Sequence, residues 1–226
     1  MFDRFVQLVE SHDKIILLRH QNPDLDAFGA QCGLYHTLQA RYPQKPILAV
    51  GHTHALKDFQ PLEVATEQDY REALVVILDT VSRQMLEGNR YELAETLVLI
   101  DHHRNDPDIR FDLYIKNPDA SSTTEILANA FLQAGWTIPL PAAEALYMGI
   151  VSDTGRFLYK SISPATFRTA AALLELGIDV QRLYDRMYAE SLEMKKLKSA
   201  FFNSIEMTAK NVAYRRNDLE FLKRHN

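Results

Sequence analysis

The feature that most constrains the fold is an alternation of short apolar runs with segments of helical pattern. The runs are rich in Val, Ile and Leu, do not alternate with polar residues, and cover residues 15–18, 47–50, 74–78 and 97–100. Strands that are covered on both faces of a parallel sheet have this pattern. Helix-like segments such as residues 26–40 and 65–72 lie between the runs. We therefore predict an α/β fold with a doubly wound, mainly parallel sheet flanked by helices.

Three helix signals refine this prediction. Ser122 and Glu125 match a capping box, which predicts that a helix begins there. Two prolines precede a further helical segment at residues 142–151. Gly29 and Gly33 lie one turn apart in the helix after the first apolar run, and we expect these small residues to let that helix lie close against the sheet.

The composition indicates a folded protein outside the membrane. Hydrophobic residues make up 46% of the 226 residues, enough for a sizeable core. The sequence has no run of 18 uncharged apolar residues, and its N-terminus lacks the apolar region of a signal peptide. Its single cysteine, Cys32, cannot form an internal disulfide. We therefore expect a cytoplasmic protein with no membrane partner.

Charge is distributed unevenly along the chain. Residues 1–190 hold 17 Lys and Arg against 26 Asp and Glu, a net charge of -9, whereas residues 191–226 hold 8 against 4, a net charge of +4. An acidic body offers few cationic contacts to the phosphates of long duplex DNA, so we exclude duplex DNA as the substrate. An anionic substrate would need another source of positive charge, and metal ions are the obvious one.

Acidic and imidazole side chains follow the predicted strands. The carboxyl ends of three strands, and one helix end further along the chain, carry five aspartates and three histidines: His20, Asp24, Asp26, Asp79, Asp101, His102, His103 and Asp153. A single aspartate after a strand is typical of a helix cap or turn. Five carboxylates at one sheet edge would repel one another unless positive charge lies among them. Carboxylate and imidazole ligands suit divalent ions such as manganese, iron, cobalt or zinc.

In order, spacing and strand context, these residues resemble the four motifs of the DHH phosphoesterases. The motifs are His20-x3-Asp24-x-Asp26, Asp79, Asp101-His102-His103 and Asp153. The family includes RecJ exonucleases, family II inorganic pyrophosphatases, cyclic-di-AMP phosphodiesterases and NrnA-type oligoribonucleases. Residues 24–30 and 149–157 look closest to the NrnA-like branch.

The resemblance implies two divalent metal ions, with manganese expected first and magnesium, cobalt or iron as alternatives. His20 and Asp24 would bind one ion, and Asp79 would bridge both. The other ion would be bound by the remaining ligands, which are Asp26, His102 and Asp153.

Other residues would act beside the ions. The resemblance places His103 near the substrate phosphate as a catalytic residue, with Asp101 orienting or supporting the site. Arg104 and Arg156 adjoin the motifs and are candidates to clamp phosphate, although a structural salt bridge explains each equally well. Ser122 begins a helix whose N-terminus is a candidate anion site, although capping alone explains it.

The resemblance implies a two-metal phosphodiesterase or phosphatase acting on small nucleotides. Short oligoribonucleotides, pAp and the cyclic-di-AMP or pApA type are the expected substrates, and a homodimer is one assembly that the sequence allows. A family II pyrophosphatase and a non-catalytic nucleotide-binding module are the alternatives. Residues 1–190 would form the catalytic domain. Residues 191–226 would form a linker helix and the start of a smaller substrate-binding domain that is otherwise missing.

Overall fold

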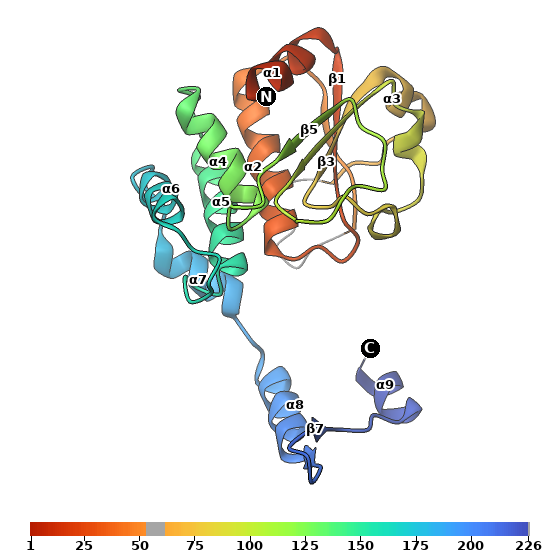
Figure 1. Cartoon of the computed structure of the whole chain (residues 1–226), viewed down its shortest axis with the longest axis vertical. Coiled ribbons are helices and arrows are strands. Elements are labelled where there is room, and N and C mark those ends of the chain that lie inside the picture. The colour runs from red at the N-terminus through yellow and green to blue at the C-terminus, as the bar shows by residue number, and fades with distance from the viewer. Residues whose placement is uncertain (53–61, 226) are drawn as a thin grey trace. The chain divides into compact units, whose positions relative to one another are not determined.

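The computed structural model describes residues 1–52 and 62–225. Its centre is a five-stranded sheet with the order β2-β1-β3-β4-β5 (Figure 1). In chain order the strands are β1 (Lys14–Arg19), β2 (Ile47–Ala49), β3 (Ala73–Leu78), β4 (Thr96–Asp101) and β5 (Leu113–Lys116). Each neighbouring pair is parallel. The predicted α/β fold with a mainly parallel sheet is confirmed.

Helices lie on both sides of this sheet. Figure 1 shows α2, α4 and α5 together on one side and α3 on the other. The α-helices that follow the N-terminus up to residue 188 are α1 (Phe2–Ser11), α2 (Leu25–Arg41), α3 (Glu67–Glu72), α4 (Thr123–Gln133), α5 (Leu140–Asp153), α6 (Pro164–Leu174) and α7 (Val180–Tyr188). Two short 3-10 helices, η2 (Arg83–Met85) and η3 (Arg90–Leu93), precede β4. Ser122 caps α4 by accepting a hydrogen bond from the amide of Glu125, which confirms the predicted helix start, whereas the carboxylate of Glu125 accepts from Ser121, so the predicted capping box is only half formed.

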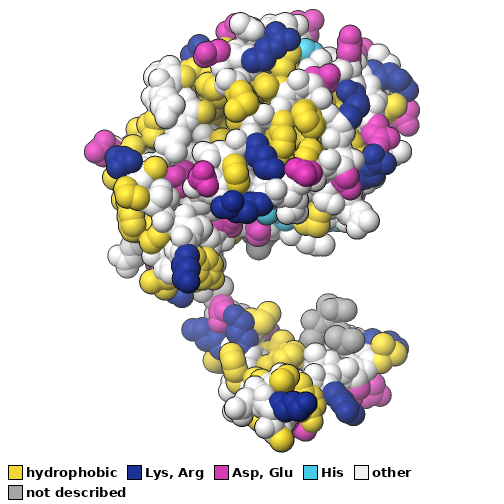
Figure 2. All heavy atoms as spheres, in the orientation of Figure 1, with side chains coloured by type: hydrophobic (Ala, Val, Ile, Leu, Met, Phe, Trp, Pro, Cys, Tyr) yellow, Lys and Arg dark blue, Asp and Glu magenta, His cyan; other side chains and the backbone are white. Residues whose placement is uncertain are grey.

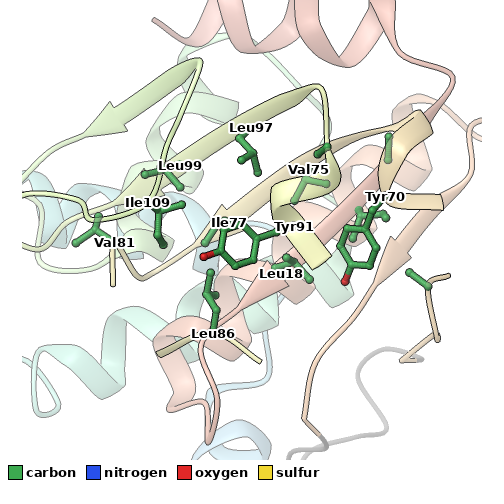
Figure 3. Close-up of a cluster of buried hydrophobic side chains, with 14 residues drawn as sticks. Leu18, Tyr70, Val75, Ile77, Val81, Leu86, Tyr91, Leu97, Leu99 and Ile109 are labelled. Atoms are coloured by element: carbon green, nitrogen blue, oxygen red, sulfur yellow. The ribbon is translucent and has the colours of Figure 1, made fainter. Parts of the chain in front are cut away.

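The strands bury side chains on both faces, which explains their continuous apolar runs. Ile16 and Leu18 belong to a cluster on one face of the sheet, together with Val75 and Ile77 of β3 (Figure 3). Successive strand residues point to opposite faces of the sheet. Ile15 and Leu17, which are equally buried, therefore face the helices on the other side of the sheet.

The sequence patterns do not predict strand β5 and helix α1. In β5 only Ile115 is buried, because the strand lies at the edge of the sheet, so no apolar run marks it. Helix α1 has three buried residues, Phe5, Leu8 and Val9, among exposed polar ones. Both elements are covered on one side only, and short amphipathic segments give a weak signal.

The expected role of Gly29 and Gly33 is wrong in one respect. A methyl group on Gly29 would overlap the carbonyl of Ala145, and one on Gly33 would overlap the side chain of Leu146, and both of these residues belong to α5. The small residues therefore let α2 pack closely against α5, not against the sheet. The sequence pattern identifies a close approach but not the partner.

The chain divides into two compact units, Met1–Leu183 and Tyr184–Asn226. The second unit contains α8 (Leu192–Asn203), a short antiparallel pair β6 (Glu206–Met207) and β7 (Ala213–Tyr214), and α9 (Leu219–His225). Among the described residues, no helix combines the length and the apolar character needed to cross a membrane.

Candidate metal centre

The sheet topology places the candidate residues at one edge. The chain leaves β1 for β2 on one side, and later returns to add β3 on the other side of β1. The carboxyl ends of strands that flank such a switch point form the usual crevice for ligands in open α/β sheets. His20 directly follows β1 and Asp79 directly follows β3, so both lie at this crevice.

His20, Asp24 and Asp79 form one group of potential ligands. Nε2 of His20 lies 3.8 Å from Oδ1 of Asp24 and 3.7 Å from Oδ2 of Asp79. Nδ1 of His20 lies 2.8 Å from the carbonyl of Gln21, and a carbonyl can only accept, so Nδ1 carries the proton. In the neutral ring Nε2 then keeps its lone pair, which is the form in which histidine binds a metal.

Asp26, His102 and Asp153 form the second group. Nε2 of His102 lies 3.4 Å from Oδ2 of Asp153 and 3.9 Å from Oδ2 of Asp26. That nitrogen is buried and has no hydrogen-bond partner among the described residues. A buried polar atom without a partner is costly, and an ion among these ligands would satisfy it. These separations fit atoms that each lie about 2.1 Å from a shared ion.

Asp79 lies between the two groups and turns one carboxylate oxygen toward each. Oδ2 faces His20, whereas Oδ1 lies 3.6 Å from Nε2 of His102 and 3.9 Å from Nδ1 of His103. Asp79 has a φ of 60°, in the left-handed region that non-glycine residues seldom adopt. Its amide still donates to the carbonyl of Ile100 at 3.0 Å, so the strand ladder holds the strained residue in place.

The N-terminus of α4 binds the carboxylate of Asp26. Oδ2 accepts from the amide of Thr123 at 2.7 Å, and Oδ1 accepts from the amide and hydroxyl of Thr124 at 2.9 and 2.6 Å. A methyl group on Gly149 of α5 would lie only 2.5 Å from Oγ1 of Thr124 and 3.0 Å from Oδ1 of Asp26. The fully buried Asp26 is therefore held by α4 and closely backed by α5.

Two of the crowded carboxylates, Asp153 and Asp79, have raised pKa values in the absence of an ion. Burial, together with the charges of Asp26 and Asp24, raises the pKa of Asp153 to about 8. The same causes raise the pKa of Asp79 well above its usual value. Nearby positive charge would reverse these shifts, and the nitrogen and oxygen donors suit a divalent ion. The residues present thus fit a metal site.

His103 and Asp101 form a pair beside the two groups. Nδ1 of His103 lies 2.7 Å from Oδ1 of the fully buried Asp101, whose other oxygen accepts from the His103 amide at 3.0 Å. The bond to Asp101 raises the pKa of His103 and fixes the ring. The side chain of His103 is still 47% exposed, so its other nitrogen can reach a ligand.

The structure separates the three weaker candidates. Arg104 is 79% exposed in its side chain and lines a pocket of about 450 Å³ together with His102, His103 and Asp153. Arg156 is exposed and does not belong to the described lining of this pocket. Ser122 is fully buried as the cap of α4. Substrate binding by these three residues stays a prediction.

Thr123 and Thr124 are site residues that sequence reasoning overlooked. Besides the bonds to Asp26, the hydroxyl of Thr123 donates to Oδ1 of Asp79 at 2.9 Å. Their only signal in the sequence is a run of four hydroxyl residues at a helix start, which capping explains by itself.

Among the described residues, two of the three groups of potential ligands divide the candidates in the way that the family resemblance implies, and the third group joins Asp79 with His102 and His103. His20 and Asp24 lie with one oxygen of Asp79, and Asp26 lies with His102 and Asp153. The metal-ligand roles themselves stay predictions.

Comparison with known proteins identifies relatives over most of the chain. Residues 14–150 match the model of the DHH family, N-terminal domain. The bifunctional oligoribonuclease and PAP phosphatase NrnA of Bacillus subtilis is 34% identical over 94% of this chain and 69% of its own length. The protein of the same name from Mycoplasma pneumoniae is 30% identical over 97% of this chain and 70% of its own. The chain thus spans about two thirds of these relatives.

Two solved structures share the fold. An exopolyphosphatase-related protein from Bacteroides fragilis superposes with a TM-score of 0.83 at 25% identity, covering 92% of this chain and 66% of that one. A putative family II inorganic pyrophosphatase from Methanococcus jannaschii superposes with a TM-score of 0.58 at 18% identity, over 79% and 61% of the two chains. The second likeness concerns the fold alone.

Proposed function

The chain belongs to the DHH family, and from that premise we propose that it is a metal-dependent phosphoesterase acting on short oligoribonucleotides and pAp. One observation carries the proposal. Asp79 turns one oxygen toward each of two ligand groups, which is the arrangement that a bridging carboxylate between two ions requires. The names of the relatives from Bacillus subtilis and Streptococcus mutans support the choice of substrate.

One divalent ion would be held by His20, Asp24 and Asp79. The other would be held by Asp26, His102 and Asp153, with Asp79 bridging the two ions. Bound ions would supply positive charge beside the phosphate and lower the pKa of a bound water from 15.7 to about 7. Manganese suits this mixture of carboxylate and imidazole ligands, with magnesium, cobalt and iron as alternatives.

His103 would act on the substrate itself. Asp101 keeps Nδ1 of the ring engaged and raises the pKa of His103, so the ring holds its proton to higher pH than usual. Nε2–H could then donate to a phosphoryl oxygen or protonate the leaving oxygen. Asp101 is fully buried and would act through His103 by fixing its orientation.

The surface charge favours a small substrate. Residues 1–190 carry a net charge of -9, which leaves little cationic surface to follow many phosphates. Figure 2 shows acidic and basic side chains interspersed over the visible face of the molecule. A dinucleotide or pAp needs only a few contacts beyond the ions.

A substrate panel in the presence of Mn²⁺ tests the proposal. It should include pAp, pApA, a short RNA, cyclic-di-AMP, pyrophosphate and long duplex DNA, so that the pyrophosphatase alternative has its own arm. We expect hydrolysis of pAp and short RNA, and its loss in Asp79→Asn. Asp13→Asn is the matched control, because exposed Asp13 lies just before β1, at the opposite end of that strand. Preferential hydrolysis of pyrophosphate, or of duplex DNA, would contradict the proposal, and binding of pAp without turnover would favour the non-catalytic module.

A further inference from the structure

The turn that follows Asp153 has an unusual backbone. Gly155, Arg156 and Phe157 have φ values of 54°, 64° and 62°, three consecutive residues in the left-handed region. Glycine adopts this conformation freely, but for Arg156 and Phe157 it costs free energy, so the surrounding contacts must hold it.

Two sets of contacts hold this turn. The carbonyl of the fully buried Thr154 accepts from the amides of Leu158 and Tyr159 at 2.9 and 3.0 Å, and its hydroxyl accepts from the amide of Phe157 at 3.0 Å. The ring of Phe157 stacks on Phe167 of α6, with the ring centroids 5.3 Å apart. The turn is therefore a fixed structure, anchored inward through Thr154 and Phe157.

The turn presents Tyr159 to solvent. Tyr159 is 60% exposed, although burying an aromatic ring stabilises a fold more than burying most other side chains does. The ring lies directly against Gly155, because a methyl group on that glycine would come within 2.5 Å of Cε1 of the tyrosine. Backbone on one side supports the ring, and most of its surface stays open.

The position of Tyr159 relates it to the candidate metal centre. Gly155, on which the ring rests, is two residues from Asp153. Lys160 and Ser161, which follow Tyr159, line the pocket of about 450 Å³ with Asp153 and His103. Lys160 and Arg104 add two cations to this lining, where the phosphates of a nucleotide would lie.

We propose that Tyr159 is the platform on which a base of the nucleotide substrate stacks, while the phosphate lies at the metal centre. The inference rests on the proposed function, which places a phosphoester at the centre. An open aromatic ring on a fixed turn, directly before Lys160 in a pocket that also contains the candidate ligands His102 and Asp153, has the parts of a nucleotide site. Stacking tolerates every base, because each base has a π-face, so this platform would suit substrates of varied sequence.

Binding measurements separate the base from the phosphate. Calorimetry in Mn²⁺ should compare adenosine 5′-monophosphate with ribose 5-phosphate, which has the same phosphate and sugar but no base. We expect the wild-type chain to bind the nucleotide about tenfold more tightly, which corresponds to about 1.4 kcal/mol. Tyr159→Ala should abolish this preference and leave affinity for ribose 5-phosphate unchanged, whereas Tyr159→Phe should keep it.

Phe111→Ala is the matched control. Phe111 is also exposed, at 44%, but it lies just before the start of β5, at the opposite end of that strand from Lys116, which pairs with Asp101. Its removal should leave the preference intact. With pAp as substrate, Tyr159→Ala should raise KM about tenfold with little change in kcat.

The outcomes distinguish this inference from the proposed function. If the wild-type chain binds adenosine 5′-monophosphate more tightly than ribose 5-phosphate, Tyr159→Ala loses this preference, and no phosphoester is hydrolysed, the stacking role of Tyr159 is supported and the proposed enzymatic function is refuted. A wild-type chain that hydrolyses pAp but binds both ligands equally, or a Tyr159→Ala chain that keeps the preference, would overturn the platform. Circular dichroism of each variant checks that the fold is retained.

Discussion

Removal of metal should make the stability of this protein fall as pH rises from 5 toward 8. In the metal-free chain, burial and the negative charges of Asp26 and Asp24 raise the pKa of Asp153 to about 8, against its ordinary value of 3.8. Between these two values the folded chain holds a proton that the unfolded chain has released. Stability then decreases with rising pH, because protons are bound more tightly by the folded state. The raised pKa values of His20 and His103 act in the same direction.

The size of the effect follows from the number of protons. One proton changes the free energy of unfolding by about 1.4 kcal/mol per pH unit. From pH 5 to pH 7 the metal-free chain should therefore lose about 2–3 kcal/mol from Asp153 alone, whose side chain is only 23% exposed. For a chain of 226 residues this corresponds to a fall in Tm of about 5–10 °C.

Thermal unfolding in chelator at pH 5, 6 and 7, repeated in saturating Mn²⁺, measures this dependence. The chelated protein should lose stability over the series, and Mn²⁺ should remove or reverse the trend because bound ions favour the deprotonated carboxylates. Asp153→Asn should flatten the dependence, whereas Asp13→Asn should leave it unchanged. A Tm that stays constant or rises with pH in chelator would refute the reasoning.

Three further predictions concern metal binding. Asp79→Asn should weaken binding of both ions together in calorimetry, whereas Arg104→Ala should leave both unchanged; unchanged binding in the first variant would show that Asp79 does not bridge. Thr124→Val deletes the hydroxyl that donates to Oδ1 of Asp26 and also contacts the hydroxyl of Ser122, and should lower affinity for one ion about 10–100-fold, read from the same titration. Gly149→Ala places a methyl group 2.5 Å from Oγ1 of Thr124 and should weaken the same ion without changing a ligand; wild-type affinity would show that α5 yields freely.

The sequence predicts the position of the candidate centre because the topology of parallel strands is simple. Once residues 15–18, 74–78 and 97–100 are recognised as buried parallel strands, the residues after them must lie at one edge. His20 and Asp79 needed no further information to be placed there, and the structure brings them to 3.7 Å.

The contacts and backbone conformation that hold the candidate ligands in place could not be predicted from the sequence. Asp26 and the Thr123–Thr124 pair are almost a hundred residues apart, and no local pattern connects a carboxylate on α2 with the amides that begin α4. The left-handed φ of Asp79 is equally hidden, because no local sequence signal marks an aspartate for this conformation. Both features depend on the packing of complete elements, which periodicity and capping rules do not specify.

Asp26 and the other central carboxylates differ in how the metal-free protein holds them. Three donors on α4 fix Asp26 in place before any ion arrives, whereas Asp79 and Asp153 have raised pKa values and hold protons. Metal binding must therefore release those protons, so affinity should rise with pH over the range in which the stability of the metal-free chain falls. The same crowding links the two effects. The metal-free chain avoids the free-energy cost of charging Asp79 and Asp153 by holding protons, an arriving ion offsets that cost, and the donors on α4 hold Asp26 in place in both states.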